Sequence, residues 1–468
     1  MNNLFQPNNR LTQALNNPLN YGFSCNFLQV EDSLDSIIHA NGWIIKVCAN
    51  SGAPSVDVSR LSPKDTKLSR GGVSSGIIPF IEAMDANARS AKRELNKNHA
   101  GLIGLDVSHP EIDAFLDVKL PMLSKVVYIT DGVTLTQQMI EKLTNYYKKQ
   151  PKLFFHKRKY DYKGVNLCTE IKDMESGDTC VLGSVNLCGY KSVTDFENNF
   201  HADLANSALK LIEIDKELKQ RYRSKRDYYE LVSLGSNNNQ VGLSCLGLAS
   251  LMGHFGVDYS NYVGSDLEAT IKAAYHYAAS VVKRTYPEYQ RVFTQAPTVH
   301  SHLRFFDAIQ NQKTGENLNV TRTIEPLQGY DYGHESGNKI SVVISQTTGN
   351  TQYFYHPNTP TVQETSSEDY FNVAIAWQNM LDSTGLSQGI SFSWFDTESD
   401  TENSFGVQDF KNWLDSPLPS LYYYVPIAKI SDNIINDKFG GEVSDQNLPA
   451  AAFDKTFDEI FSDCECGG

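Results

Sequence analysis

The order in which strand-like and helical segments follow one another constrains the fold more than any other feature of this sequence. Apolar runs predict strands over residues 43–47, 126–130 and 339–345. Helical spacing of apolar residues predicts helices over residues 204–218, 245–255, 267–281 and 370–381. Because the two patterns interleave along most of the chain, we expect an α/β architecture.

Two short motifs predict where helices begin. Ser265 and Glu268 form a capping box ahead of the helix at 267–281, and Pro287 should end or kink that helix. Ser108 and Glu111 form the same pattern ahead of a short amphipathic segment. Both motifs would satisfy backbone N–H groups that a first helical turn leaves unpaired.

The composition excludes a disordered chain and argues against two classes of partner. Of 468 residues, 40% are hydrophobic and 21% are charged, which is the balance of a globular protein with a large core. The net charge of −14 gives no broad positive field, so we expect no nucleic-acid partner. The N-terminus lacks the apolar core of a signal peptide, and the longest weakly polar run, residues 241–253, is too short to cross a bilayer. We therefore expect a cytoplasmic protein without membrane contact.

The eight cysteines do not show the spacing of a metal site. No two of them form a CxxC pair and no HExxH occurs, so we expect no metal bound by this chain. The sequence also lacks a GxGxxG motif and a Walker A loop, so any nucleotide site must use another architecture. Cys48, Cys188 and Cys245 are expected to be buried packing residues.

Two cysteines at the C-terminus, Cys464 and Cys466, suggest a redox shuttle. They are separated by one residue and end an acidic segment, residues 437–468, that we expect to be mobile. A thiol pair on a tether can reduce a disulfide elsewhere by exchange, and a thioredoxin- or glutaredoxin-like protein can then reduce the pair again. As a coil, the segment would reach on the order of 30 Å.

Several short motifs resemble, in the same order along the chain, those of ribonucleotide reductase catalytic (α) subunits. The central one is Asn-x-Cys-x-Glu at residues 166–170, followed by Thr-Cys-Val-Leu-Gly-Ser-Val-Asn-Leu at residues 179–187. Weaker matches lie at residues 23–37, 59–63, 70–76, 109–112, 324–326 and 421–423. Each match is weak alone, but the collinear set covers most of the chain.

The resemblance implies a particular fold and domain organisation. The fold would be a ten-stranded α/β barrel made of two five-stranded halves, with a central finger loop that carries a cysteine at its tip. Residues 1–436 would form this catalytic barrel and residues 437–468 a flexible redox tail. The chain leaves no room ahead of Cys25 for an N-terminal ATP-cone, so it looks like a minimal, phage-like α subunit.

The resemblance also assigns roles in replacing the ribose 2′-hydroxyl of a ribonucleotide by hydrogen. Cys168 would form the thiyl radical that abstracts hydrogen from C3′. Glu170 would act as general base on the 3′-hydroxyl, and Asn166 would hydrogen-bond the substrate or Glu170. Cys25 and Cys180 would supply two electrons and end as a disulfide, which the tail thiols would reduce.

The origin of the radical decides the subclass. Residues 421–425 resemble the strand whose two adjacent tyrosines relay a radical from a separate ferritin-like metal subunit, which favours Tyr422 and Tyr423, with Tyr424 as an alternative register. This implies class I and a ferritin-like β partner. Residues 59–76 resemble the adenosylcobalamin-dependent class II at least as much, so class II stays the alternative. The glycyl-radical class is disfavoured, because its glycyl motif and four-cysteine zinc site are missing.

Nucleotide binding by an acidic chain needs neutral donors such as hydroxyls and helix N-termini. Residues 297–301 occupy the place of the family's phosphate loop, so the resemblance implies that Thr298, His300 and Ser301 bind substrate, together with Ser24. Mg²⁺ would accompany the bound nucleotides.

Regulation by a deoxynucleotide effector is implied by three further matches. Asp32, Ser33 and Arg60 match positions that contact such an effector in relatives. A helix cap and a solvated charge are the alternative interpretation of these residues. A possible homodimer is also implied.

We therefore expect a ribonucleoside-diphosphate reductase that uses a thioredoxin-like donor. Two alternatives stay open: a class II enzyme, and a non-catalytic nucleotide-binding protein that has kept the barrel. The intact Cys168 and Glu170, together with the remaining thiols, argue against the second alternative.

Overall fold

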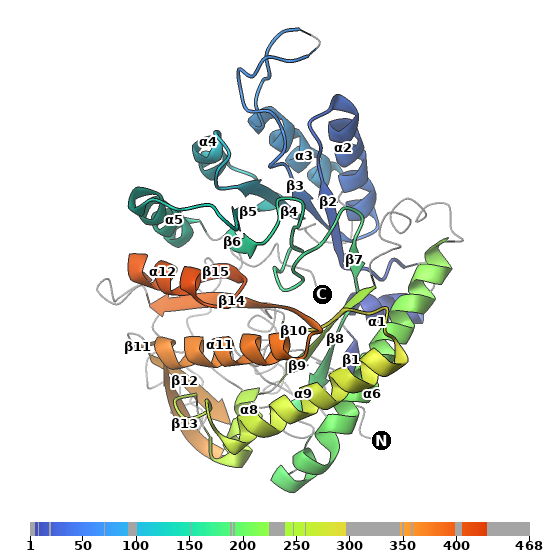
Figure 1. Cartoon of the computed structure of the whole chain (residues 1–468), viewed down its shortest axis with the longest axis vertical. Helices are drawn as coiled ribbons and strands as arrows, with labels where there is room; N and C mark the ends of the chain where they lie inside the picture. Colours follow the sequence, from blue (N-terminus) through green and yellow to red (C-terminus); the bar gives the residue numbers. More distant parts are fainter. Residues whose placement is uncertain are drawn as a thin grey trace, which may run out of the picture.

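The computed structural model describes most of the chain. The described residues are 5–7, 9–17, 20–69, 71–91, 101–150, 152–187, 190, 192–223, 239–246, 248–257, 259–295, 347–348, 351–356, 359–397 and 405–427. Figure 1 looks into a ring of strands that is surrounded by helices.

Twelve strands of the described residues form one sheet that curls into a barrel. They are β1 (Phe5–Pro7), β2 (Cys25–Gln29), β3 (Ala53–Asp57), β4 (Gly101–Asp106), β5 (Leu123–Thr130), β6 (Leu153–Arg158), β7 (Thr179–Cys180), β8 (Leu182–Asn186), β9 (Gln240–Leu246), β10 (Arg291–Gln295), β14 (Ser387–Thr397) and β15 (Ser420–Ile427). Their order in the sheet is β1-β8-β9-β10-β14-β15-β6-β5-β4-β3-β2-β7. A separate antiparallel sheet contains β11 (Thr347–Thr348), β12 (Thr351–His356) and β13 (Thr359–Ser366).

The large sheet contains two parallel halves of five strands each. The first half runs from β2 to β6, and the second contains β8, β9, β10, β14 and β15. The halves meet where β15 pairs with β6 in the antiparallel sense. The α/β barrel of two five-stranded halves, expected from the family resemblance, is therefore confirmed.

Residues 179–186 close the ring on its other side. Their first part, β7, pairs with β2, and the chain continues after Val181 as β8, which pairs with β9. The Val181 carbonyl accepts a hydrogen bond from the Gly242 N–H at 2.9 Å. One short stretch of chain thus joins the two half-barrels.

Helices cover the outside of the barrel (Figure 1). They are α1 (Asn9–Asn16), α2 (Leu34–Ala49), α3 (Ile78–Ser90), α4 (Ile112–Asp117), α5 (Gln137–Lys149), α6 (Val193–Arg223), α8 (Leu248–Phe255), α9 (Asp266–Thr285), α11 (Ser367–Ser383) and α12 (Val407–Asp415). Each helix between two parallel strands returns the chain to the same end of the sheet, as parallel pairing requires. In the described part of the chain, no helix is long and apolar enough to span a membrane.

Several predicted elements are confirmed. The strand predicted at 126–130 lies in β5, and the helices predicted at 204–218 and 370–381 lie in α6 and α11. Ser265 caps α9, since its Oγ accepts from the Glu268 N–H at 3.2 Å, and α9 ends two residues before Pro287. The segment predicted at 339–345 lies outside the described residues.

Three local predictions are wrong. Residues 43–47 belong to helix α2 rather than to a strand, because spacings of three and four also place Trp43, Ile44 and Val47 on one buried helix face. Ser108 and Glu111 form no capping box, since the side chain of Glu111 instead accepts from the backbone N–H groups of Lys64 and Ile77. The helix predicted from Cys245 begins only at Leu248, as α8, because Cys245 lies within strand β9, which ends at Leu246.

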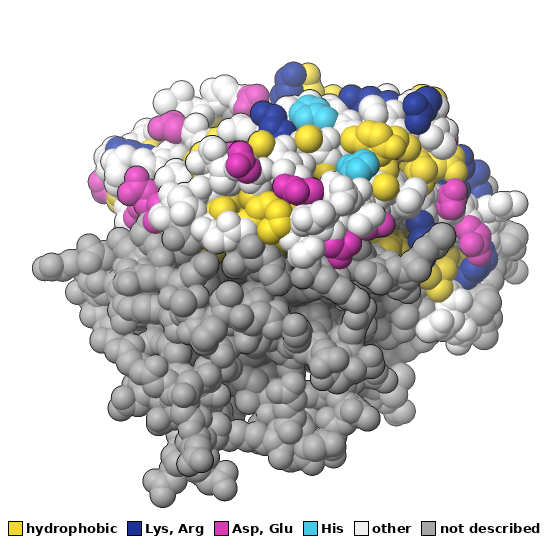
Figure 2. All heavy atoms as spheres, turned by 90° about the horizontal axis from the view of Figure 1, so that it is seen from below, with side chains coloured by type: hydrophobic (Ala, Val, Ile, Leu, Met, Phe, Trp, Pro, Cys, Tyr) yellow, Lys and Arg dark blue, Asp and Glu magenta, His cyan; other side chains and the backbone are white. Residues whose placement is uncertain are grey.

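The barrel is filled and surrounded by one large cluster of buried apolar side chains. A second, smaller cluster contains Cys25, Phe27, Ile171, Met174, Cys180 and Leu182. On the face that Figure 2 shows, acidic and basic side chains of the described residues lie interspersed rather than gathered by sign.

Candidate active site

The segment between β6 and β7, residues 159–178, runs into the middle of the ring of strands (Figure 1). We refer to it as the finger loop. Its two legs are bridged at Gly164 and Met174, where the N–H of each residue donates to the carbonyl of the other at 2.9 Å. Gly164 also packs so closely against Phe27 of β2 that a Cβ atom there would overlap the ring. The loop therefore fills the barrel instead of crossing its outside.

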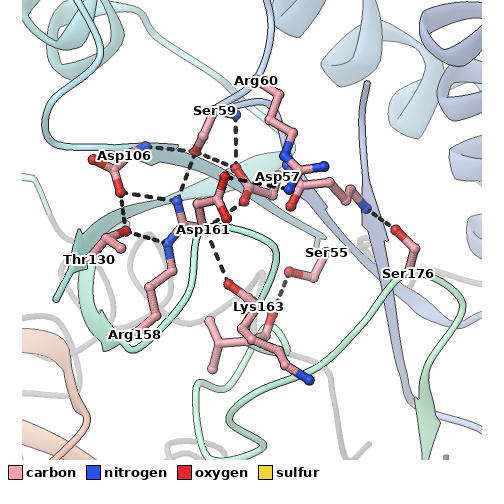
Figure 3. A network of polar contacts seen from close by, with 12 residues as sticks. Ser55, Asp57, Ser59, Arg60, Asp106, Thr130, Arg158, Asp161, Lys163 and Ser176 are labelled. Atoms are coloured by element: carbon pink, nitrogen blue, oxygen red, sulfur yellow. Dashed lines mark hydrogen bonds and ion pairs between the residues drawn. The ribbon is translucent and has the colours of Figure 1, made fainter. Parts of the chain in front are cut away.

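A buried ionic network anchors the first leg of the finger loop (Figure 3). Arg158 ends β6, and its guanidinium lies 2.6 Å from Asp57 Oδ2 and 3.0 Å from Asp106 Oδ2, at the ends of β3 and β4. Its Nε donates to Thr130 Oγ1 at 2.8 Å. Nη1 also donates to the carbonyl of Lys163 in the loop at 3.2 Å. One cation thus ties four strand ends to the loop.

Two serine hydroxyls hold the legs further along (Figure 3). Ser55 Oγ on β3 donates to the carbonyl of Val165 at 2.6 Å. On the returning leg, Ser176 Oγ accepts from the backbone N–H of Gln29 at 2.8 Å. Both contacts bind the loop to strands of the first half-barrel.

The tip of the finger loop is a tight turn that contains Cys168. The Thr169 N–H donates to the carbonyl of Asn166 at 3.0 Å, and Thr169 has a φ of 62°, in the left-handed region. The Asn166 side chain closes the turn, because its Oδ1 accepts from the Ile171 N–H at 2.9 Å. The Cys168 residue is only 6% exposed.

Three hydroxyl groups of the second half-barrel contact this tip. Ser420 Oγ on β15 donates to the carbonyl of Thr169 at 2.9 Å, and Ser391 Oγ on β14 lies 3.0 Å from Thr169 Oγ1. Thr294 Oγ1 on β10 lies 3.1 Å from the carbonyl of Glu170. The second half-barrel therefore holds the tip through hydroxyl groups. It also contacts the returning leg, because Arg291 of β10 donates to the carbonyls of Lys172 and Asp173 at 2.9 and 2.6 Å.

Cys25 and Cys180 lie directly opposite each other. They are Cα partners in the antiparallel pair of β2 and β7, and both are buried thiols. Opposed residues in such pairs have Cα atoms about 4.5–5.5 Å apart, which is within the range that a disulfide spans. Two cysteines from remote parts of the sequence are thus placed where they can be oxidised to a disulfide.

Asn166 connects this thiol pair to the finger tip. Its Nδ2 lies 3.1 Å from Cys25 Sγ and donates to Glu170 Oε1 at 2.9 Å. An amide NH₂ group has two hydrogens, so both contacts can form at once. One buried cluster therefore contains a thiol, an amide and a carboxyl group.

The Glu170 carboxyl group is buried and incompletely paired. Its Oε2 has no hydrogen-bond partner among the described residues, which is rare for a buried oxygen. Burial raises the pKa of this carboxyl from 4.5 to about 7, although hydrogen bonds from its own backbone and from Asn166 favour the charged form. A carboxylate with this pKa can accept a proton at neutral pH.

Tyr422 and Ser420 lie on the same face of β15, because they contact Phe154 and His156, which are alternate residues on one face of β6. Its ring is buried, with its centroid 4.4 Å from that of Phe154 on β6. Since Ser420 contacts the finger tip, Tyr422 lies on the face of β15 that carries this contact. Tyr423 and Tyr424 follow in the same strand.

The three residues predicted to bind an effector lie near one another at the carboxyl ends of β2 and β3. Asp32 accepts from the N–H and the Oγ of Ser62 at 3.0 and 2.5 Å. Ser33 caps α2, and Arg60 pairs with Glu31 at 2.6 Å. Each of the three therefore already has a partner in the chain.

Of the residues predicted to bind substrate, Ser24 is buried with its Oγ 3.6 Å from Cys25 Sγ. The other predicted substrate and tail residues lie outside the described part of the chain: Thr298, His300, Ser301, Cys464 and Cys466.

Sequence reasoning missed three polar residues that contact the finger loop, namely Arg158, Ser391 and Ser420. Each stands in a strand that is otherwise largely buried, where a polar group requires a hydrogen-bond partner. A polar residue in an otherwise apolar strand was therefore the sequence signal that could have identified them. The partners are distant in the sequence, so no local motif could identify them.

Sequence comparisons match part of this chain to known proteins. Residues 23–164 match the family described as "Ribonucleotide reductase, barrel domain". A "Vitamin B12-dependent ribonucleotide reductase" of Streptomyces clavuligerus is 33% identical over 113 residues, which are 23% of this chain and 11% of that protein. A "Vitamin B12-dependent ribonucleoside-diphosphate reductase" of Mycobacterium tuberculosis is 23% identical over 330 residues, which are 62% of this chain and 47% of that protein. The chain thus matches 11% of the length of the first curated relative and 47% of the length of the second.

Among solved structures, the chain is similar to the "Actinobacillus ureae class Id ribonucleotide reductase alpha subunit". The TM-score is 0.62 at 14% identity, and the match covers 92% of this chain and 88% of that one. At this identity the likeness concerns the fold. Together with the family match, it confirms the resemblance that the motifs predict.

Proposed function

We propose that this chain, which has the ribonucleotide reductase barrel fold, reduces ribonucleotides to 2′-deoxyribonucleotides by thiyl-radical chemistry. The observation that carries the proposal is the cluster at the finger tip. Asn166 touches both Cys25 and Glu170, Cys180 lies opposite Cys25, and Cys168 lies in the same turn.

The first half of the reaction uses the buried finger tip. A thiyl radical at Cys168 abstracts hydrogen from C3′, a reversible step because S–H and ribose C–H bonds have similar strengths. Glu170 accepts the proton of the 3′-hydroxyl, which helps the 2′-hydroxyl to leave as water. The near-complete burial of both groups keeps solvent away from the radical.

The second half uses the thiol pair. Cys25 and Cys180 together give two electrons and two protons, so that one oxygen leaves C2′ as water, one hydrogen takes its place, and an S–S bond forms. Cys168 returns its hydrogen to C3′ and is a thiyl radical again. The balance is one ribonucleotide and two thiols consumed for one deoxyribonucleotide, one disulfide and one water.

Repeated turnover needs the disulfide to be reduced. We assign this step to Cys464 and Cys466 at the end of residues 437–468, with residues 1–436 as the catalytic barrel and a thioredoxin- or glutaredoxin-like protein as the final donor.

Two groups of residues would bind nucleotides. Ser24, Thr298, His300 and Ser301 would contact the substrate, whose charge Mg²⁺ would balance. The residues Asp32, Ser33 and Arg60 would contact a deoxynucleotide effector.

The oxidant that converts the Cys168 thiol to a thiyl radical comes from outside this chain. We favour a class I enzyme, in which a ferritin-like subunit delivers it through Tyr422 and Tyr423, because Tyr422 is buried on the face of β15 that contacts the finger tip. A class II enzyme is the second candidate, because curated relatives are named vitamin B12-dependent. In that case adenosylcobalamin would supply the oxidation.

A reduction assay separates these candidates. The chain is incubated with a ribonucleotide and a thiol reductant, either with a candidate ferritin-like subunit or with adenosylcobalamin. Product only with the subunit, lost in Tyr422→Phe, supports class I, whereas product with adenosylcobalamin alone supports class II. Cys168→Ser should abolish product in either arm. Nucleotide binding without product in both arms would overturn the proposed function in favour of a binding protein.

A further inference from the structure

The seam between the two half-barrels holds a buried imidazole that the reaction above does not use. His156 on β6 and Ser420 on β15 are Cα partners across this seam. Nδ1 of His156 lies 2.8 Å from Ser420 Oγ, and the histidine is 1% exposed. Ser420 Oγ in turn donates to the carbonyl of Thr169, which follows Cys168 in the finger tip.

The direction of these hydrogen bonds follows from the number of protons. A serine hydroxyl has one hydrogen, and the carbonyl of Thr169 can only accept, so the hydrogen of Ser420 points to that carbonyl. Nδ1 of His156 must then carry a hydrogen and donate it to Ser420. Burial, together with nearby cations such as Arg158, lowers the pKa of His156 to about 3, so the ring stays neutral near pH 7.

We propose that His156 and Ser420 form a positioning pair that fixes the Thr169 peptide, and through it the places of Cys168 and Glu170. The inference rests on the proposed function, because it concerns how closely these two groups approach the ribose.

The conformation of Thr169 shows why such a pair is needed. A φ of 62° is unfavourable for a residue with a branched side chain, and it persists only where neighbouring groups hold it. Ser420 holds the carbonyl of Thr169, and Ser391 contacts its hydroxyl. The Arg158 network contacts the first leg of the loop at Lys163, whereas Ser420 and Ser391 contact the tip.

If His156 served only to fill space, it would stabilise the fold less than an apolar residue. With the hydrogen on Nδ1, its Nε2 is an acceptor, and Nε2 has no hydrogen-bond partner among the described residues. A buried polar atom without a partner is unfavourable, and an apolar residue of similar shape would avoid that cost. The donor at Nδ1 is therefore the property that distinguishes histidine from an apolar residue at this position.

The test compares variants that remove the hydrogen bonds with variants that keep them. Ser420→Ala and His156→Leu remove them, whereas Ser420→Thr keeps the hydroxyl and His156→Asn keeps an N–H donor. Thr144→Ala is the matched control, because Thr144 is equally buried and its hydroxyl donates only within α5. The full-length chain is assayed with its radical source and with a substrate that carries deuterium at C3′.

We expect Ser420→Ala and His156→Leu to lower kcat by about 10- to 100-fold, because misplacement by an ångström has effects of this size. KM should stay within about twofold of the original value. The 3′-deuterium isotope effect on kcat should rise, as hydrogen abstraction becomes rate-limiting. Ser420→Thr and His156→Asn should recover most of kcat, and Thr144→Ala should change neither quantity.

Amide hydrogen exchange over residues 164–172 provides a readout that does not need turnover. Exchange in this segment should be faster in Ser420→Ala than in the original chain and unchanged in Thr144→Ala. Unchanged exchange, or a lower kcat with an unaltered isotope effect, would overturn the positioning role. If the original chain reduces no ribonucleotide, the proposed function fails, while exchange still decides whether the pair holds the tip.

Discussion

At the scale of single residues, the site is built from polar groups that are buried at a cost to stability. Glu170 has one carboxylate oxygen without a partner in the described structure, and burial raises its pKa to about 7. The Asn-x-Cys-x-Glu motif identified this residue, but its burial and its contact with Asn166 depend on the whole barrel. A motif therefore predicts which residue is present and not how strongly its pKa is shifted.

The pKa of Glu170 predicts a pH dependence of activity. A general base must be deprotonated, so kcat/KM should rise with pH through about 7 in the original chain. Glu170→Gln should lower activity by about 100-fold or more and should lack this rise, because the amide does not titrate. The pH profile of kcat/KM checks both points. A variant that retains the same rise would place the base elsewhere.

The same substitution should stabilise the folded chain at high pH. The pKa of Glu170 is about 7 in the folded chain and has its ordinary value of 4.5 in the unfolded chain. Below pH 4.5 the carboxyl is neutral in both states and the folded chain has its full stability. This stability is lost as the pH rises through 7 and the buried carboxyl becomes charged. Glu170→Gln stays neutral, so above pH 7 its free energy of unfolding should be higher by on the order of 3 kcal/mol. Denaturant unfolding on both sides of this range measures the difference. Equal stability above pH 7 would show that the carboxylate is well solvated.

At the scale of elements, the finger loop depends on contacts from both half-barrels. The resemblance predicted such a loop, whereas a local pattern was misleading elsewhere. Residues 43–47 fit a strand as well as a helix, and they form part of helix α2 because other apolar residues of α2 are buried on the same face. Arg158 was missed because Asp57 and Asp106 lie far from it in the sequence. Contacts of this kind become visible only when the strands are side by side.

Removing the cation of the buried network should destabilise the barrel. Arg158→Met leaves Asp57 and Asp106 without their ion pairs, and breaking a buried pair costs about 3–5 kcal/mol. Arg60→Met is the control, because its pair with Glu31 is partly exposed and should contribute less than about 1 kcal/mol. Denaturant unfolding of both variants checks the difference, and similar losses would contradict the role given to the network.

At the scale of the whole molecule, the site lies where two parallel half-barrels of opposite direction meet. Collinear motifs predicted this fold, but the closure by residues 179–186, which sets Cys180 opposite Cys25, follows from strand pairing that no local pattern reveals. The exchange between this pair and the tail thiols stays a prediction, since Cys464 and Cys466 lie outside the described residues.

The tail can be tested by its effect on successive turnovers. The double variant Cys464→Ser, Cys466→Ser should perform its first turnover at the original rate, because Cys25 and Cys180 begin as thiols. It should then stop when a thioredoxin-like protein is the donor. Counting product per chain over time checks this, and undiminished multiple turnover would remove the tail from the mechanism.

The most direct test of the account is whether Cys25 and Cys180 are the thiols that reduce the substrate. The tail double variant is fully reduced, freed of reductant and mixed with ribonucleotide and the radical source, after which product is counted and disulfides are mapped by mass spectrometry. We predict deoxyribonucleotide and a disulfide joining Cys25 to Cys180 in equal amounts. Product formed while both cysteines remain thiols would contradict the account.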